Sequence, residues 1–69
     1  MVKTVKEYDG RWTVYNTYSG ETATIISFKE QGYLANGKPM YRIDINNQTV
    51  KSMITHFATA KAEAKKLVS

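Results

Sequence analysis

The chain has 69 residues, a net charge of +4 and no cysteine. A chain of this length forms one small domain, residues 1–69, for which we expect either marginal stability or support from a partner. The composition excludes disulfides, thiolate metal sites and thiol nucleophiles, and no apolar run approaches the ~20 residues of a membrane span, so we expect a soluble cytoplasmic protein with no membrane partner.

The N-terminal part predicts an extended segment followed by a β-hairpin. Residues 1–9 are polar with weak alternation and predict an extended lead-in or a short edge strand. From Arg11 to Tyr18, aromatic and β-branched residues alternate with polar ones, which favours a strand. Tyr18-Ser19-Gly20 predicts a three-residue hairpin loop, because glycine accepts the left-handed backbone needed at the third loop position. The second strand is expected to run from about Thr22 to Lys29.

An Asn36-Gly37 pair predicts a second hairpin, because both central residues of a type I′ turn need positive φ. A two-residue turn there places Lys29 opposite Asp44 and Phe28 opposite Ile45, so the antiparallel sheet spans residues 10–46. The two hairpins agree on one inner face, whose members are Trp12, Val14, Ile26, Phe28, Leu34, Tyr41, Ile43 and Ile45.

The C-terminal region, residues 49–68, predicts a helix whose start is open. Apolar residues recur at helical spacing from Val50 to Val68, which favours one helix from about Thr49, and Thr59 is a candidate N-cap for its Ala- and Lys-rich part. The alternative makes residues 48–55 a further strand after an Asn46-Asn47 turn. Both interpretations give an α+β domain: an antiparallel sheet of three strands, or of four on the alternative, with one C-terminal helix packed on one face.

Catalytic and metal-ligating residue types are too few and too scattered to predict an enzyme. His56 is the only histidine, and nothing in the spacing links it to a serine and an acid, as nucleophilic catalysis requires. Asp9, Glu30 and Asp44 show no metal-ligand spacing, and the four glycines stand singly rather than in a phosphate-binding loop. We therefore expect a non-enzymatic protein with no cofactor and no metal.

The outer face of the predicted sheet combines aromatic, cationic and hydroxyl side chains. The whole net charge follows Phe28, where seven cationic residues stand against three anionic ones. Because rings stack on bases and cations meet phosphates, such a face favours DNA or RNA; an acidic protein partner and a merely solvated sheet surface are the alternatives. The candidate binding residues are Arg11, Tyr15, Lys29, Tyr33, Met40 and Arg42, with a secondary basic patch on the helix at Lys61, Lys65 and Lys66.

Two short motifs carry a family resemblance. Gly10-Arg11-Trp12 opens a predicted strand, and Phe57-Ala58-Thr59 leads into a helix with Lys61, Glu63 and Ala64. This pattern resembles the arm-type, AP2-like N-terminal DNA-binding domains of phage and transposon integrases. The resemblance implies a free-standing, phage-encoded module whose three-stranded sheet enters the major groove with the helix behind it, and DNA contacts from Arg11, Tyr15, Lys29 and Arg42. The chain departs from the family in the greater length of residues 30–48 and in its fewer cationic strand residues.

Two further alternatives concern protein partners. As a phage-type inhibitor or adaptor that modulates a host factor, the chain would use the same sheet face or the basic helix face. As a homodimer, it would use the predicted Tyr33–Met40 edge, or apolar helix positions that the sheet does not cover.

Overall fold

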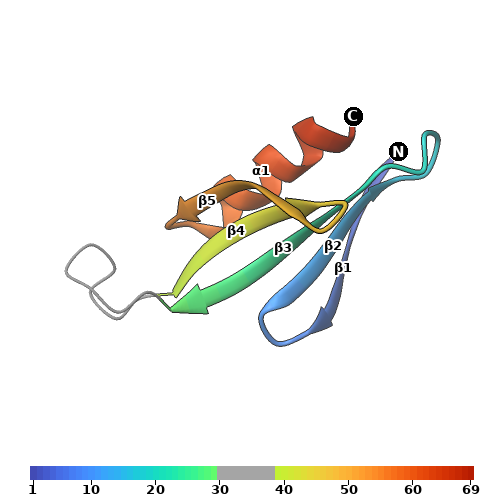
Figure 1. The fold of residues 1–69 in the computed structure, drawn as a ribbon. Helices are drawn as coiled ribbons and strands as arrows, with labels where there is room; N and C mark the ends of the chain where they lie inside the picture. The colour runs from blue at the N-terminus through green and yellow to red at the C-terminus, as the bar shows by residue number, and fades with distance from the viewer. Residues whose placement is uncertain (30–38) are drawn as a thin grey trace.

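The structure is a computed structural model that describes residues 1–29 and 39–69. Within these residues, five strands form one antiparallel sheet in chain order, and one helix covers one of its faces (Figure 1). The predicted α+β class is confirmed, but the sheet has five strands instead of three or four. The elements are β1 (Val2–Tyr8), β2 (Arg11–Asn16), β3 (Thr22–Lys29), β4 (Pro39–Ile45), β5 (Gln48–Ile54) and α1 (Phe57–Val68).

Of the two alternatives predicted for residues 1–9, the edge strand is confirmed, because Val2–Tyr8 form β1 at one edge of the sheet. β1 runs antiparallel to β2 along Val2–Lys6, and its register shifts before Tyr8. The turn at Asp9-Gly10 closes this hairpin, with Gly10 at φ 92°, in a left-handed backbone conformation that glycine adopts without steric cost. Lys6 Nζ lies 2.9 Å from Asp9 Oδ1, and its hydrogen bond and positive charge lower the pKa of the Asp9 carboxyl.

The β2–β3 hairpin differs by one residue from its predicted register. Four residues, 17–20, connect the paired positions instead of three. Trp12 lies opposite Ile25, which places Ile25 on the inner face. Ile26 and Phe28, both predicted for the inner face, therefore lie on the outer face, because side chains alternate along a strand and a one-residue slip exchanges its two faces.

The side chain of Asn16 organises this longer loop and connects it to the helix. Its Oδ1 accepts hydrogen bonds from the backbone N–H of Tyr18 at 2.8 Å and of Ser19 at 3.3 Å. Its Nδ2 donates to the carbonyl oxygen of Val68, 2.9 Å away in the last turn of α1. One amide thus fixes the loop conformation and satisfies a helix C-terminal carbonyl, which has no partner within the helix.

Replacing Asn16 with Ala is expected to lower the free energy of unfolding by about 1–2 kcal/mol, because the loop and the helix end lose their shared partner. The neighbouring Thr17→Ala, which removes one exposed hydrogen bond to the Met1 carbonyl, serves as the control and should cost less than about 0.5 kcal/mol. Urea unfolding followed by circular dichroism measures both. Equal stabilities of the two variants would contradict the role assigned to Asn16.

The β3–β4 register places Lys29 opposite Pro39, five residues from its predicted partner, Asp44. Ile25 faces Ile43 across this pair of strands, and both side chains are fully buried. The observed register thus buries the two isoleucines together on the inner face. The predicted pairs of Lys29 with Asp44 and of Phe28 with Ile45 are wrong; the predicted inner positions of β4 are confirmed, and Leu34 and Asn36-Gly37 lie outside the described residues.

Residues 48–54 form β5, so the interpretation of residues 49–68 as one helix is wrong and the alternative strand is confirmed. Asn46 and Asn47 have φ values of 52° and 65°, as a type I′ turn requires. Met53, at φ 58°, lies where the register with β4 shifts, and this irregularity obscures the strand alternation. The helix begins at Phe57 with His56 at the N-cap, and not after Thr59.

The helix packs on the inner face of the sheet through small residues. Ala60, Ala64 and Val68 are buried in one cluster with Val14, Ala23, Ile25 and Ile43. At the start of α1, the Phe57 ring packs against Trp12 and Tyr41, with centroid distances of 4.5 Å and 5.6 Å. The helix thus covers the inner face, and among the described elements none lies on the opposite face (Figure 1).

Candidate functional site

The outer face of the sheet is the surface of β2, β3 and β4 opposite α1. Its residues follow from the observed register, because positions next to the buried ones point the other way. It is half-exposed over most of its area and mixes hydroxyl, apolar and charged groups. Its members are Arg11, Thr13, Tyr15, Thr22, Thr24, Ile26, Phe28, Met40, Arg42 and Asp44.

A row of three side chains crosses the middle of the outer face. Arg11 lies opposite Ile26, and Ile26 lies opposite Arg42, so two guanidinium groups flank one isoleucine on adjacent strands. These three residues line a shallow depression of about 410 Å³ together with Thr22, Thr24, Asp44, Asn46 and Asn47. The depression therefore offers a ligand one apolar side chain between two cations, in a lining that is otherwise polar.

Each arginine of the row is held by a carboxylate. Arg11 Nε lies 3.4 Å from Glu7 Oε2, and Arg42 Nε lies 3.5 Å from Asp44 Oδ1. Asp44 Oδ1 also accepts a 2.8 Å hydrogen bond from Thr49 Oγ1. The arginine side chains are still 40% and 42% exposed. Both guanidinium groups thus lie beside a carboxylate while part of each side chain faces solvent, and within the described residues the buried Arg42 Nε has no hydrogen-bond partner.

The predicted binding residues are only partly brought together. Arg11, Tyr15 and Arg42 lie on the outer face as predicted. Met40 also lies on this face but is only 4% exposed, which leaves little of it for a ligand. Lys29 is the last residue of β3, and Tyr33 lies outside the described residues. The corrected register adds Thr24, Ile26 and Phe28, which the predicted register assigns wrongly or omits.

The predicted basic patch lies on the helix, in the layer behind the sheet. Lys65 and Lys66 are exposed in the last turn of α1, where cations interact favourably with the helix dipole. Lys61 is half-buried one turn earlier. Because α1 lies on the inner side of the sheet, this patch and the outer face belong to different layers of the molecule (Figure 1).

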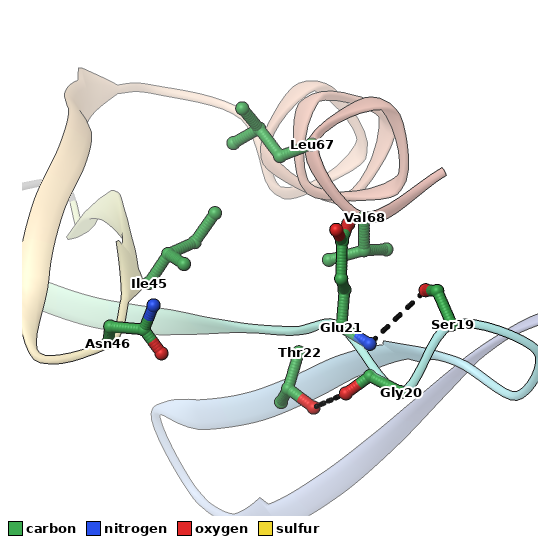
Figure 2. A pocket seen from close by; sticks show the side chains of 8 residues that line it. All are labelled: Ser19, Gly20, Glu21, Thr22, Ile45, Asn46, Leu67 and Val68. Carbon is green, nitrogen blue, oxygen red and sulfur yellow. Dashed lines mark hydrogen bonds between the residues drawn. The ribbon is translucent and has the colours of Figure 1, made fainter.

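A second depression, of about 470 Å³, lies at the end of the sheet next to the C-terminus of α1. Figure 2 shows Ile45 and Asn46 on one side of it, Glu21 and Thr22 on the other, and Leu67 above. The β3–β4 pairing begins only at Thr24, so the two strands diverge here. This depression holds one carboxylate and no nucleophile–base pair, and no group of three metal-ligating side chains occurs in residues 1–29 and 39–69.

Comparisons with known proteins found no relative from which a role of the outer face could be inferred. No protein-family model matches the chain, and no curated protein or solved structure matches it. Within the part of the chain that the structure describes, no helix is long and apolar enough to cross a membrane.

Proposed function

We propose that the protein is a non-enzymatic binding module whose outer face binds single-stranded nucleic acid. The observation that carries the proposal is the Arg11–Ile26–Arg42 row on an open sheet face. Exposed guanidinium groups bind phosphate oxygens, often through two parallel hydrogen bonds. Between them, Ile26 and the neighbouring threonines offer apolar contact and hydroxyl donors to a sugar or base.

The width of the sheet favours a single strand over a duplex. Five strands at ~4.8 Å spacing span about 19 Å from β1 to β5, whereas the major groove of B-DNA is about 12 Å wide. The three-stranded sheet that the integrase resemblance implies would fit that groove, whereas here β1 and β5 extend the sheet on either side of the three strands of the outer face. A single strand needs only a surface with cations along its backbone path and rings for its bases.

The aromatic residues of the outer face lie on both sides of the arginine row. Tyr15 is opposite Thr22 near one end of β3, and Phe28 is opposite Met40 near the other. Both rings are half-exposed. A nucleic-acid strand that follows the row, with its phosphates at Arg11 and Arg42, would therefore bring its bases towards one ring on either side of the row. Such stacking tolerates any sequence, so we expect little sequence preference.

Fluorescence anisotropy with a labelled oligothymidine of about 12 nucleotides tests this function. Two arginine–phosphate contacts on a single strand predict a salt slope near −1.4, so raising the salt from about 50 to 200 mM should weaken binding about sevenfold. A duplex of the same length is the control and should bind more weakly. Absence of binding at about 50 mM salt, or tighter binding to the duplex, would contradict the proposal.

A second candidate function is binding of an acidic protein, as an inhibitor or adaptor. The supporting observation is the exposed surface of α1, where Lys65 and Lys66 adjoin Leu67, an exposed apolar side chain. Cations beside an apolar group suit a protein interface. A pull-down after nuclease treatment distinguishes the two functions: one stoichiometric protein, lost on Lys65→Glu/Lys66→Glu, would favour this candidate over the first.

A further inference from the structure

The described sheet has two edge strands, β1 and β5, and they differ in regularity. β5 shifts register twice against β4 and contains Met53 at φ 58°. Such irregularities bend an edge away from a straight partner strand. β1 shifts register once, between Lys6 and Tyr8, and pairs with β2 without interruption along Val2–Lys6. Of the two edges, β1 is therefore the one that can accept another strand.

The hydrogen bonds to β2 determine which backbone groups of β1 face outward. The Thr17 N–H donates to the Met1 carbonyl over 2.8 Å, in the same register as the rest of the β1–β2 ladder. Residues of an antiparallel strand bond alternately to either side, so Lys3 and Val5 bond towards β2. The N–H and C=O groups of Val2, Thr4 and Lys6 then point to the open edge.

The sequence of β1 is self-complementary in one antiparallel register. With Val5 on a two-fold axis, Thr4 lies opposite the partner's Lys6 as a hydrogen-bonded pair, and Lys3 lies opposite the partner's Glu7. An axis at Lys6 would bring the two Lys6 ammonium groups face to face. An axis at Thr4 would place Lys3 opposite the partner's Val5, so that Lys3 would lose its opposite charge. Glu7 already lies on the outer side of the sheet, beside Arg11, so the pairing continues a row of alternating charge.

We propose that a second copy of this chain pairs with β1 across a two-fold axis at Val5. Val5 is 47% exposed and Tyr8 is 61% exposed on this strand, and the pairing covers apolar surface that is otherwise in water. The two sheets then join edge to edge into one sheet with five strands from each copy, and the two outer faces lie on the same side of it. The contact involves backbone pairing and charge, so it does not depend on the nucleic-acid proposal.

One strand from each copy makes a small interface, so the dimer should dissociate on dilution. Sedimentation equilibrium over a range of concentrations is expected to show a monomer–dimer equilibrium. A single monomeric species at all concentrations up to about 1 mM would overturn the proposal.

A cysteine at position 5 tests the position of the axis. The natural chain contains no cysteine, so V5C carries one thiol. Residues facing each other in a non-hydrogen-bonded pair have Cα atoms about 4.5 Å apart, within the range of a disulfide. Val50, 46% exposed on the other edge strand, provides the matched control, V50C. With oxidised glutathione, V5C should give a disulfide-linked dimer at least about tenfold faster than V50C.

Equal rates for V5C and V50C would overturn the proposed axis. A second pair of variants changes charge instead of adding a thiol. V5K places two ammonium groups face to face and should raise the dimer dissociation constant at least about tenfold, whereas V50K should leave it unchanged. Circular dichroism melting confirms that each variant is folded. A dimer that persists in V5K and is lost in V50K would assign the contact to β5 and overturn the proposal.

Discussion

Replacing Ile25 with Ala is expected to lower the free energy of unfolding by about 3 kcal/mol, and the same change at Ile26 by less than about 1 kcal/mol. Ile25 is fully buried between Trp12 and Ile43 on the inner face, so its loss leaves a cavity beneath the helix. Ile26 lies half-exposed on the outer face, where water fills the space. In a domain this small, 3 kcal/mol corresponds to a fall of about 12–24 °C in Tm.

The pair Ile25→Ala and Ile26→Ala is a matched test of the β2–β3 register, because the predicted register reverses the order of the two effects. Thermal and urea unfolding, followed by circular dichroism, measure both variants against the natural chain. A larger loss of stability in Ile26→Ala would mean that Ile26 occupies the core. That result would also remove Ile26 from the Arg11–Ile26–Arg42 row and, with it, the basis of the proposed function.

Replacing both arginines with glutamine, R11Q/R42Q, is expected to weaken binding of single-stranded oligonucleotide about 30- to 150-fold. Each arginine contributes a charge-assisted contact to a phosphate, worth about 1–1.5 kcal/mol when it is lost. The salt slope should fall towards zero, since the released counterions belong to these two contacts. Anisotropy titrations at two salt concentrations measure both quantities.

The double variant K65Q/K66Q is the matched control for R11Q/R42Q. This variant also removes two positive charges, but from the exposed C-terminal end of α1, which lies in the other layer of the molecule. If the outer face binds the ligand, this control should change affinity by less than about threefold, through the long-range field alone. Equal losses in the two double variants would mean that net charge, and not the arginine row, carries the binding.

The inner faces of β2 and β4 could be predicted because alternation of apolar and polar residues directly reports a strand with one buried side. Trp12, Val14 and Ile43 lie where this pattern places them. The pairing of β3 could not be predicted in the same way. Both faces of that strand carry isoleucine, so its orientation depends on loop length, which Asn16 fixes through bonds to Tyr18, Ser19 and the distant Val68.

The two strands beyond the three predicted ones, β1 and β5, differ in how clearly the sequence indicates them. Asp9-Gly10 is a strong hairpin signal, and it could have identified β1 as the partner of β2. β5 is harder to recognise, because the irregularity at Met53 spoils its alternation and allows its apolar residues to fit a helical period. The Asn46-Asn47 turn is the local signal that favours a strand after it.

Some residues of the candidate site could be predicted from the sequence, but their arrangement in space could not. Arg11 and Arg42 are predicted for the outer face, since each neighbours a residue of the inner face. Their position on either side of Ile26 follows only from the observed registers of two hairpins. Their carboxylate partners, Glu7 and Asp44, likewise depend on β1 and on the conformation of each side chain.

A titration of the ¹⁵N-labelled protein with oligothymidine, followed by NMR, tests the central claim that the outer face binds single-stranded nucleic acid. The chain has two arginines, both on the outer face, and one tryptophan, on the inner face. The Nε–H signals of Arg11 and Arg42 are expected to shift on addition of the oligonucleotide, while the indole N–H signal of Trp12 stays in place. Shifts confined to Trp12 and the amides of α1, with both arginine signals unchanged, would contradict this claim.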